Sequence, residues 1–264
     1  MNDAVDTGAT HPLGADLRHG GVNFSVYSED ATRLELLLFD AVDDPRPARV
    51  IALDPACHRT YHYWHAFVPG IGAGQIYAYR ALGPAEPGRG LRFDADKVLL
   101  DPYGRCVAMP VGYDRQSVAA PGDNAAVAMK SVVTDPGGYD WEGDQPLRRP
   151  FSQTVIYEMH LAGFTRHPSS GVAPQRRGTY AGMIEKIPYL RDLGVTAVEL
   201  LPVFQFDPYD APPGRVNYWG YAPVSFFAPR PLWPRGARAR AEHQLRHLPR
   251  RLHPERSGLL RPQA

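Results

Sequence analysis

Alternating hydrophobic and polar residues divide the first part of the chain into short β-strands. In the stretch GVNFSVYS, Val22, Phe24 and Val26 alternate with more polar residues, which is the two-residue period of a half-buried strand. Four similar segments follow, bounded by Asp, Pro and Gly residues that favour turns: RLELLLFD, RVIAL, YHYWHAFVP and QIYAYRAL. Because no helical period separates them, the pattern predicts an all-β, immunoglobulin-like antiparallel sandwich over residues 12–110.

A different pattern begins near Gln153, after a connecting region at residues 111–150 that is rich in Gly, Pro, Asp and Asn. The apolar run TVIYEMHL predicts a strand buried on both sides, and VTAVELLPV predicts a second strand. Between them, aliphatic residues recur every three positions, as on one helix face: Ile184, Ile187, Leu190 and Leu193. Pro188 has to kink this helix or begin another, and Gly194 can end it. This order predicts a parallel βαβ unit with a right-handed crossover.

Composition excludes several classes of protein. Hydrophobic residues make up 44% of the chain, which suits a packed core and not a disordered protein. The net charge of +1 gives no overall field that would select nucleic acid or an anionic membrane. Cys57 and Cys106 form no disulfide framework and no zinc-binding spacing. Since neither a signal peptide nor an apolar run of ~20 residues is present, we expect a cytoplasmic protein without cofactors.

Several long, ordered segments carry a family resemblance that covers residues 12 to 229. TVIYEMHLAGFTRH, GTYAGMIEKIPYLRDLGVTAVELLPVFQFD and NYWGYAPVSFFAP resemble the opening of the catalytic barrel in glycoside hydrolase family 13, particularly its isoamylase-type glycogen debranching enzymes. GVNFSVYSEDATRLELLLFD, WHAFVPGIGAGQIYAYRALGP and LRFDADKVLLDPYG resemble the family-48 carbohydrate-binding module that precedes that barrel. The resemblance implies a (β/α)8 barrel beginning at residues 151–229, and hydrolysis of α-1,6-glucosidic branch linkages in glycogen or related α-glucans.

The same resemblance implies a retaining mechanism, which needs two carboxylates about 5–5.5 Å apart. In this family they lie at the C-terminal ends of later barrel strands. The third-strand motif, an Asp-Val-Val run ending in Asn-His, is absent from the sequence, and so are the later segments that bear the carboxylates. We therefore expect an incomplete barrel, no catalytic residue in this chain, and no activity of the chain by itself.

The chain changes character near Arg230. Beyond it, Glu242 and Glu255 are the only acidic residues among many arginines. All but three of the 29 basic residues in the chain are arginine, a bias that GC-rich DNA would produce. Residues 230–264 are therefore predicted to be an aberrant Arg-rich tail from a frameshift or misassembled end. A nucleic-acid-binding arm is the weighed alternative, but the segment has no recognisable binding motif and no interleaved aromatic residues.

Three aromatic residues are the candidate substrate contacts. By resemblance, Tyr218, Trp219 and Tyr221 follow the second barrel strand and line the pocket that holds the glucose at the scissile bond. Aromatic rings stack on the apolar C–H faces of sugars and leave the hydroxyls to polar neighbours. Ordinary packing of a loop is the alternative, because apolar burial is the commonest use of an aromatic side chain.

Other polar residues have structural alternatives that the sequence favours. His58, His62 and His65 suggest a metal site, but residues 62 and 65 point to opposite faces of a strand, so surface and core positions are preferred. Trp64 is expected in the core and not at a glucan site. Structural roles are predicted for Glu158 and His160, and for Glu199 a buried hydrogen bond. Sugar hydroxyls are possible partners of two loop carboxylates that are more commonly solvated, Asp207 and Asp210.

Three functional hypotheses remain after these steps. The first is glycogen debranching as the activity of the family. The second is a non-catalytic α-glucan-binding module or partner subunit, which would bind a branched glucan without releasing new reducing ends. The third is another reaction of the same family, either branching or the release of trehalose. All three take an α-glucan as the partner, and none involves nucleic acid or a membrane.

Overall fold

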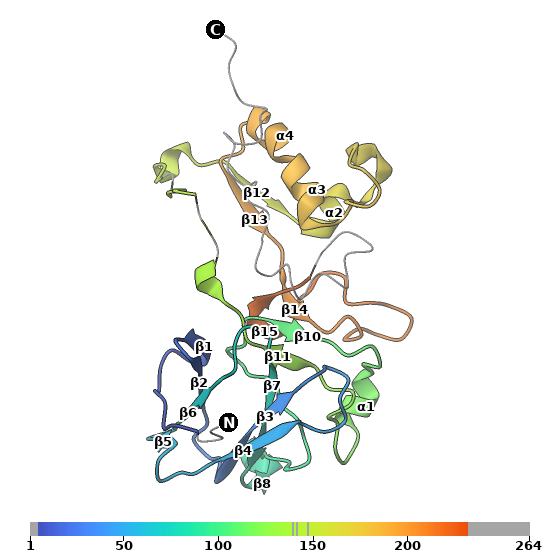
Figure 1. Ribbon diagram of the computed structural model, residues 1–264. Coiled ribbons are helices and arrows are strands. Elements are labelled where there is room, and N and C mark those ends of the chain that lie inside the picture. Colours follow the sequence, from blue (N-terminus) through green and yellow to red (C-terminus); the bar gives the residue numbers. More distant parts are fainter. Residues whose placement is uncertain (1–4, 139, 141, 147, 232–264) are drawn as a thin grey trace. The chain divides into compact units, whose positions relative to one another are not determined.

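The structure is a computed structural model in which contacts between residues define two compact units (Figure 1). It describes residues 5–231 except 139, 141 and 147. The first, here called the sandwich unit, comprises residues up to 135 together with 204–216 and 222–229. The second, here called the βαβ unit, comprises residues 136–203, 217–221 and the described residues that follow position 229. Except for Arg230 and Pro231, the predicted Arg-rich tail lies outside the described residues.

The sandwich unit is built on two antiparallel sheets. The first has the strand order β1-β2-β6-β5, with β1 at Gly14–Arg18, β2 at Gly21–Tyr27, β6 at Tyr63–Pro69 and β5 at Arg59–Thr60. The second has the order β10-β11-β7-β3-β4, with β10 at Val107–Ala108, β11 at Lys130–Val132, β7 at Ile76–Leu82, β3 at Arg33–Phe39 and β4 at Arg49–Leu53. All five strands predicted from the alternation pattern are confirmed as β2, β3, β4, β6 and β7.

The remaining short elements belong to both units, with the 3-10 turns that follow residue 135 in the βαβ unit. They are a two-stranded pair, a helix, a hairpin and four 3-10 turns: β8 (Ala85–Glu86), β9 (Leu91–Arg92), α1 (Arg115–Ala119), β14 (Phe204–Phe206), β15 (Pro223–Pro229), Pro87–Arg89, Pro136–Gly138, Phe151–Gln153 and Pro168–Ser170. The antiparallel β14–β15 pair is tied to the sandwich unit by Ser225, whose Oγ donates to the Gly104 carbonyl at 3.0 Å.

A hydrophobic core fills the space between the two sheets. Side chains at alternate positions of the strands point into it, including Val22, Phe24, Leu36, Trp64 and Tyr77. Trp64 is completely buried, so its predicted place in the core is confirmed. Its indole Nε1–H donates to the Ser28 carbonyl at 3.2 Å, which satisfies the one polar atom of the ring.

The outer face of the second sheet is buried as well. Leu37 and Phe39 of β3 and Ala78 of β7 cluster there with Val98, Ala125 and Ala128. The last three belong to residues 98–128, here called the covering segment. Because the segment covers the outer face while the core covers the inner one, β3 is apolar at consecutive positions and does not alternate.

Lys130 connects the covering segment to the second sheet. It begins β11, is completely buried, and points to the outer face of the sheet. Its ammonium donates to the carbonyl of Val42 at 2.6 Å and to that of Ala125, and it lies 4.6 Å from the centroid of the Phe39 ring. A single buried cation therefore connects the strand, the loop after β3 and the covering segment.

Asp101 is a second buried charged residue, and it bonds to Tyr77 of the core between the two sheets. It is completely buried, and its carboxylate accepts hydrogen bonds from the Tyr77 hydroxyl at 2.7 Å and the Tyr103 amide at 2.8 Å. Burial raises the pKa of Asp101 to about 6, against the opposing effect of these two hydrogen bonds. The structure thus holds a carboxyl group that is more easily protonated in the folded chain than in water.

The βαβ unit contains the predicted strand–helix–strand sequence. β12 (Ile156–Met159) and β13 (Ala197–Leu200) are parallel, and α2 (Leu161–Arg166), α3 (Tyr180–Glu185) and α4 (Ile187–Asp192) connect them (Figure 1). The predicted break of the helix is confirmed, since α4 begins at Ile187 with Pro188 in its first turn. Gly194 has a left-handed φ of 89° and follows the last turn, as expected of a helix-ending glycine.

The prediction that the TVIYEMHL strand, β12, is buried on both sides is wrong for the chain as described, and β13 is exposed as well. Ile156, Val198 and Leu200 are exposed by 53%, 39% and 37%, and Leu193 of the predicted apolar helix stripe by 56%. The residue pattern of a buried strand is present, but two strands and three short helices do not cover both faces. Among the described residues, no helix has the length and apolarity that crossing a bilayer requires.

Candidate functional site

The three candidate aromatic residues lie on one short loop of the βαβ unit, residues 217–221, here called the aromatic loop. The side chain of Asn217 closes it, because its Nδ2 donates to the Tyr221 carbonyl at 2.9 Å and its Oδ1 accepts from the Gly220 amide at 3.1 Å. Gly220 has a left-handed φ of 81°, which a glycine adopts without strain. The loop is therefore shaped by its own first residue.

His160 holds the aromatic loop against the first helix. Its Nδ1 accepts from the Gly163 amide at 2.9 Å, which caps the N-terminus of α2, and its Nε2 donates to the Tyr218 carbonyl at 3.0 Å. The imidazole also stacks on the Tyr218 ring, with centroids 4.4 Å apart at 29°. A Cβ on Gly163 would lie 2.9 Å from the Tyr218 hydroxyl and 3.2 Å from Nδ1 of His160, so a larger residue there would displace these side chains. His160 therefore has the structural role predicted for it: it caps α2 and positions Tyr218.

The charge state of His160 agrees with such a role. Burial lowers the pKa of His160, the hydrogen bond to the Tyr218 carbonyl raises it, and the nearby Arg166 and Arg230 lower it. Because Nδ1 accepts a backbone N–H, the neutral ring carries its proton on Nε2. At neutral pH the imidazole therefore serves as a fixed donor and acceptor pair, and not as a proton shuttle.

The arrangement leaves two of the three aromatic rings open to solvent. Trp219 is 54% exposed and Tyr221 is 59% exposed, whereas Tyr218 is partly buried between His160 and Arg166. The Trp219 ring stands edge-on to that of Tyr218, with centroids 5.3 Å apart. Rings held in this way can stack on apolar faces of a ligand without first having to be ordered.

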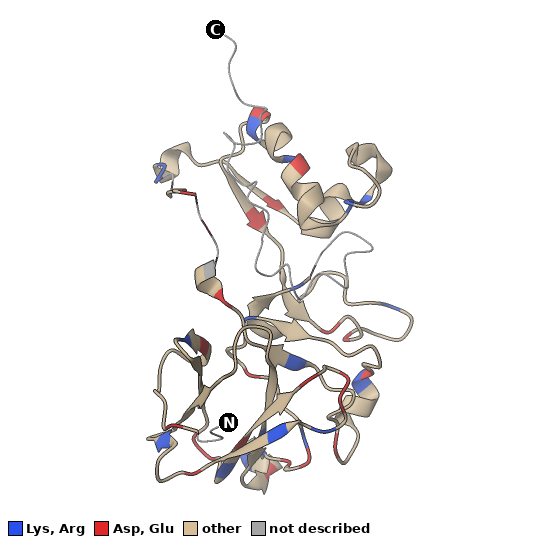
Figure 2. Cartoon of the chain, viewed as in Figure 1, with Lys and Arg blue, Asp and Glu red and all other residues tan. Residues whose placement is uncertain are grey.

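Two carboxylates lie next to each other on the strands of the βαβ unit. Glu158 and Glu199 are register partners in the parallel pair, and Figure 2 shows the acidic segments of β12 and β13 side by side. Both residues are exposed, so the buried hydrogen bond predicted for Glu199 is wrong. A glycosidase places its carboxylates by hydrogen bonds in a site that excludes water. An exposed sheet face does not provide that environment.

The two acidic residues of the loop after β14, expected to be solvated, bond to other side chains of the chain. Asp207 is 1% exposed and accepts from the Tyr113 hydroxyl at 2.8 Å and from Arg115 at 2.7 Å. Arg115 also forms an ion pair with Asp210 at 3.1 Å. The interpretation of Asp207 as a solvated carboxylate is therefore wrong: it fastens the loop after β14 to the segment around α1 within the sandwich unit.

The histidines of the sandwich unit have separate partners. His65 is buried, donates from Nδ1 to the Thr7 carbonyl at 2.7 Å, and lies 2.9 Å from the Thr60 hydroxyl through Nε2. His58 accepts from the Asp54 amide at 3.1 Å, and His62 lies on the surface near Glu29. Among the described residues, no group of three or more His, Cys, Asp and Glu side chains is placed to hold a metal ion.

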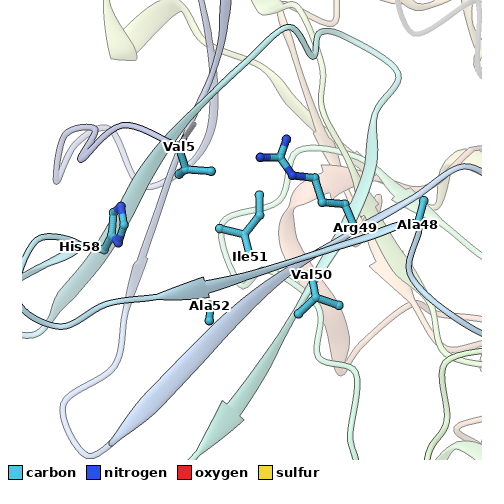
Figure 3. Close-up of a pocket in the computed structure, with 7 residues that line it drawn as sticks. All are labelled: Val5, Ala48, Arg49, Val50, Ile51, Ala52 and His58. Atoms are coloured by element: carbon cyan, nitrogen blue, oxygen red, sulfur yellow. The ribbon is translucent and has the colours of Figure 1, made fainter. Parts of the chain in front are cut away.

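One pocket of about 580 Å³ opens beside the edge strand β4, at a distance in sequence from the aromatic loop. Figure 3 shows Arg49 and Ile51 pointing to one side of β4 and Val50 and Ala52 to the other, with Val5 and His58 near Ile51. Its lining residues include no carboxylate. The pocket therefore lacks the acid and the nucleophile that cleavage of a glycosidic bond requires.

Comparison with known proteins shows which proteins the chain is similar to. Residues 12–104 match the family model of carbohydrate-binding module 48 (Isoamylase N-terminal domain). Isoamylase 1, chloroplastic, of Oryza sativa subsp. japonica is 40% identical over 230 residues, which are 85% of this chain and 28% of the rice protein. The chain is similar to isoamylases and glycogen debranching enzymes over most of its own length. The glycogen debranching enzyme of Serratia proteamaculans (strain 568) is 42% identical over 235 residues, 84% of this chain and 34% of that enzyme.

Solved structures match the chain as well. The pullulanase SAP of Group B Streptococcus matches with a TM-score of 0.65 and 23% identity over 89% of this chain and 30% of the pullulanase. At this identity the match shows the fold alone. The chain spans only 28% to 34% of the length of the two relatives named above. The resemblance stated from the sequence is thereby confirmed at the level of the family.

Sequence reasoning named the aromatic residues of the loop but missed what positions them. The signal for His160 was its place near the end of a predicted strand and three residues before Gly163, where a side-chain acceptor can cap a helix. The signal for Asn217 was an Asn three residues before a glycine, which is a common turn pattern. Neither pattern is specific enough by itself to predict the contact with the aromatic loop.

Proposed function

We propose that the chain is part of a protein that hydrolyses α-1,6-glucosidic branch linkages in glycogen or a related α-glucan. The observation that carries the proposal is the aromatic loop, preorganised by Asn217 and His160, in a chain about 40% identical to isoamylases and glycogen debranching enzymes. Tyr218, Trp219 and Tyr221 would contact the glucan, with Tyr221 and Trp219 offering exposed ring faces. No cofactor is needed for this chemistry.

The division of labour along the chain belongs to the same proposal. Residues 12–110 would form the carbohydrate-binding-module-like sandwich, 111–150 the connection, and 151–229 the opening strand–helix–strand part of a (β/α)8 barrel. The exposed apolar residues of β12 and β13 support the barrel interpretation, because a barrel would cover them with further strands and helices. We retain the cytoplasm as the proposed compartment, although the rice relative is named as chloroplastic.

A hydrolysis assay tests whether this chain holds the catalytic carboxylates. We expect the chain incubated with glycogen to bind the glucan and to release no reducing ends above the blank. Glu158→Gln and Glu199→Gln should leave both results unchanged, since these exposed side chains are not part of a catalytic pair. Trp219→Ala should weaken binding by several-fold, because an exposed indole contributes roughly 1 kcal/mol or more to stacking.

The alternative is a non-catalytic glucan-binding module or partner subunit. Retention on glycogen without hydrolysis, both by this chain and by the longer protein that contains it, would favour that alternative. If instead the chain released linear oligosaccharides at a rate that Glu158→Gln or Glu199→Gln abolished, the expectation that it lacks catalytic carboxylates would be wrong. Branching or trehalose release would appear as a different product in the same assay.

Limited proteolysis tests the proposed division into a self-sufficient sandwich and a partial barrel. The sandwich unit has its core covered on both sides of the second sheet, whereas the strands of the βαβ unit expose apolar residues. We therefore expect cleavage in residues 136–203 at low protease concentration, while a fragment that contains residues 5–135 resists. Equal protection of both parts would contradict the proposed partial barrel.

A further inference from the structure

A tyrosine occupies a backbone position that normally selects glycine or asparagine. Thr60 of β5 pairs with Tyr63 of β6, which leaves Tyr61 and His62 as the two residues of the hairpin turn. Tyr61 has a left-handed φ of 58°, and its side chain is 77% exposed. Two-residue hairpin turns favour Gly, Asn or Asp where φ is positive. The turn therefore presents a large aromatic ring to solvent where a smaller residue would fit the backbone better.

Arg59 fixes this turn in place. Its Nε donates to the Tyr61 carbonyl at 2.9 Å, and a terminal nitrogen donates to the Glu29 carbonyl at 3.0 Å. The guanidinium also lies 4.9 Å from the centroid of the buried Trp64 ring, which anchors it to the core. The exposed ring of Tyr61 thus rests on a rigid support and not on a free loop tip.

Further aromatic rings surround Tyr61 and form what we call the aromatic patch: Tyr27, Tyr61, His62 and Tyr63. The imidazole of His62 is 3.8 Å from the Tyr61 centroid, and Tyr27 meets His62 and Tyr63 edge-on at 5.8 and 5.4 Å. Tyr27 is itself 43% exposed. Two tyrosines of the same unit, from different strands or turns, are therefore open to a ligand at one place.

Polar groups lie at the border of the aromatic patch. The Tyr27 hydroxyl donates to a carboxylate oxygen of Glu29 at 3.2 Å, and the other oxygen of that carboxylate lies 4.0 Å from Nε2 of His62. The Glu29 side chain is 61% exposed and can accept hydrogen bonds from a ligand as well. Ring faces together with hydroxyl, imidazole and carboxylate groups match a ligand with both apolar C–H faces and many hydroxyls.

We propose that the aromatic patch is a glucan-binding surface of the sandwich unit, on which Tyr61 stacks against a pyranose ring and Glu29 and Tyr27 bond to its hydroxyls. The ligand class is a neutral α-glucan chain, and this choice rests on the proposed function together with the carbohydrate-binding-module match of residues 12–104. An anionic ligand fits less well, because the exposed carboxylate of Glu29 lies at the border and the Arg59 guanidinium is taken up by backbone carbonyls. The surface is separate from the aromatic loop, which belongs to the other unit.

Substitution of Tyr61 separates binding from folding. Tyr61→Gly removes the ring and places glycine where φ is positive, so thermal stability should be unchanged or higher. Affinity for soluble glycogen and for maltoheptaose, measured by mobility in glycogen-containing native gels and by calorimetry, should fall about tenfold. Tyr61→Phe, which keeps the ring, should bind within about twofold of the unsubstituted chain.

Comparison with the aromatic loop makes the result specific. The two surfaces act on separate positions, so the losses from Tyr61→Gly and Trp219→Ala should multiply in the double variant. Unchanged binding by Tyr61→Gly, in a chain that binds glycogen, would overturn the aromatic patch and leave the proposed function standing. A chain that does not bind either glucan would overturn both. Equal loss with Tyr61→Phe would also contradict stacking on the ring.

Discussion

Lys130→Ala is expected to lower the free energy of unfolding of the sandwich unit by about 3 kcal/mol, or its midpoint temperature by about 10 °C. The substitution removes a buried cation that bonds to carbonyls of Val42 and Ala125 and covers the ring of Phe39. The carbonyls that lose their donor lie beneath the covering segment, where water cannot replace the ammonium without opening the structure. Urea or thermal unfolding followed by circular dichroism measures the loss.

Two further variants define the cause. Lys130→Met keeps the apolar stem over Phe39 and removes only the ammonium, so it should lose less stability than Lys130→Ala. Lys97 is a matched control, because its ammonium bonds to the carbonyls of Ala120 and Gly122 in the same segment but is partly exposed. Lys97→Ala should cost less than about 1 kcal/mol. A similar loss for Lys97→Ala and Lys130→Ala would contradict the argument from burial.

Asp101 is expected to make the sandwich unit less stable as pH rises from 4 to 7. Burial raises the pKa of Asp101 from 3.8 to about 6, so the folded chain binds a proton there more tightly than the unfolded chain. The stability this proton provides is fully present below pH 4 and is lost as pH passes 6. Since one pKa unit corresponds to about 1.4 kcal/mol, the loss is about 3 kcal/mol.

Asp101→Asn tests this dependence, because an amide cannot ionise. The free energy of unfolding of the variant minus that of the original chain should increase by about 3 kcal/mol between pH 4 and pH 7, because only the original chain loses stability as pH rises. Denaturant titrations at several pH values measure the difference. Asp96→Asn removes an exposed carboxylate from the preceding loop and serves as the control for general charge effects. A difference between Asp101→Asn and the original chain that stays constant with pH would refute the prediction.

The strands of the sandwich were predictable because local alternation reports which residues face the core. Val22, Phe24 and Val26 carry that signal within one strand. The covering segment was not predictable in the same way. A lysine at position 130 is read as a surface residue, since burial of its ammonium depends on carbonyls that lie up to 88 residues away in sequence.

The βαβ unit shows the converse limit. The apolar run of β12 predicted burial on both faces, that of β13 predicted a second strand, and the order of the elements was confirmed. Burial, however, depends on what covers a strand, and the described residues leave Ile156 and Val198 open. The sequence of a strand therefore indicates the environment it is suited to, whether or not its neighbours are present.

The candidate site was also predictable only in part. The aromatic residues of the loop at 217–221 were identified from their type and their resemblance to a family pattern. The contacts of His160 and Asp207 were not predicted, because their partners are distant in sequence. His160 bonds to Tyr218, 58 residues away. Asp207 bonds to Tyr113 and Arg115, 94 and 92 residues away. Single-sequence patterns have a range of a few residues and cannot anticipate such pairs.

The N-terminal residues bear on how the module can be excised for study. Asp6 exchanges two backbone hydrogen bonds of 2.9 Å with Phe67. The backbone N–H of Ala9 donates to Oδ1 of the buried Asn23 at 2.7 Å, and Nδ2 of Asn23 donates to the Ala9 carbonyl at 2.9 Å. The match to the family model of carbohydrate-binding module 48 covers residues 12–104, which omits Asp6, Ala9 and β11. A domain cut at those limits would leave Phe67 of β6 without its backbone hydrogen bonds to Asp6, and the side-chain amide of Asn23 without its bonds to Ala9. It would also lack Lys130. Residues 5–135 keep all three features and lack only β14, β15 and the loop after β14, which join the sandwich unit through Ser225 and Asp207.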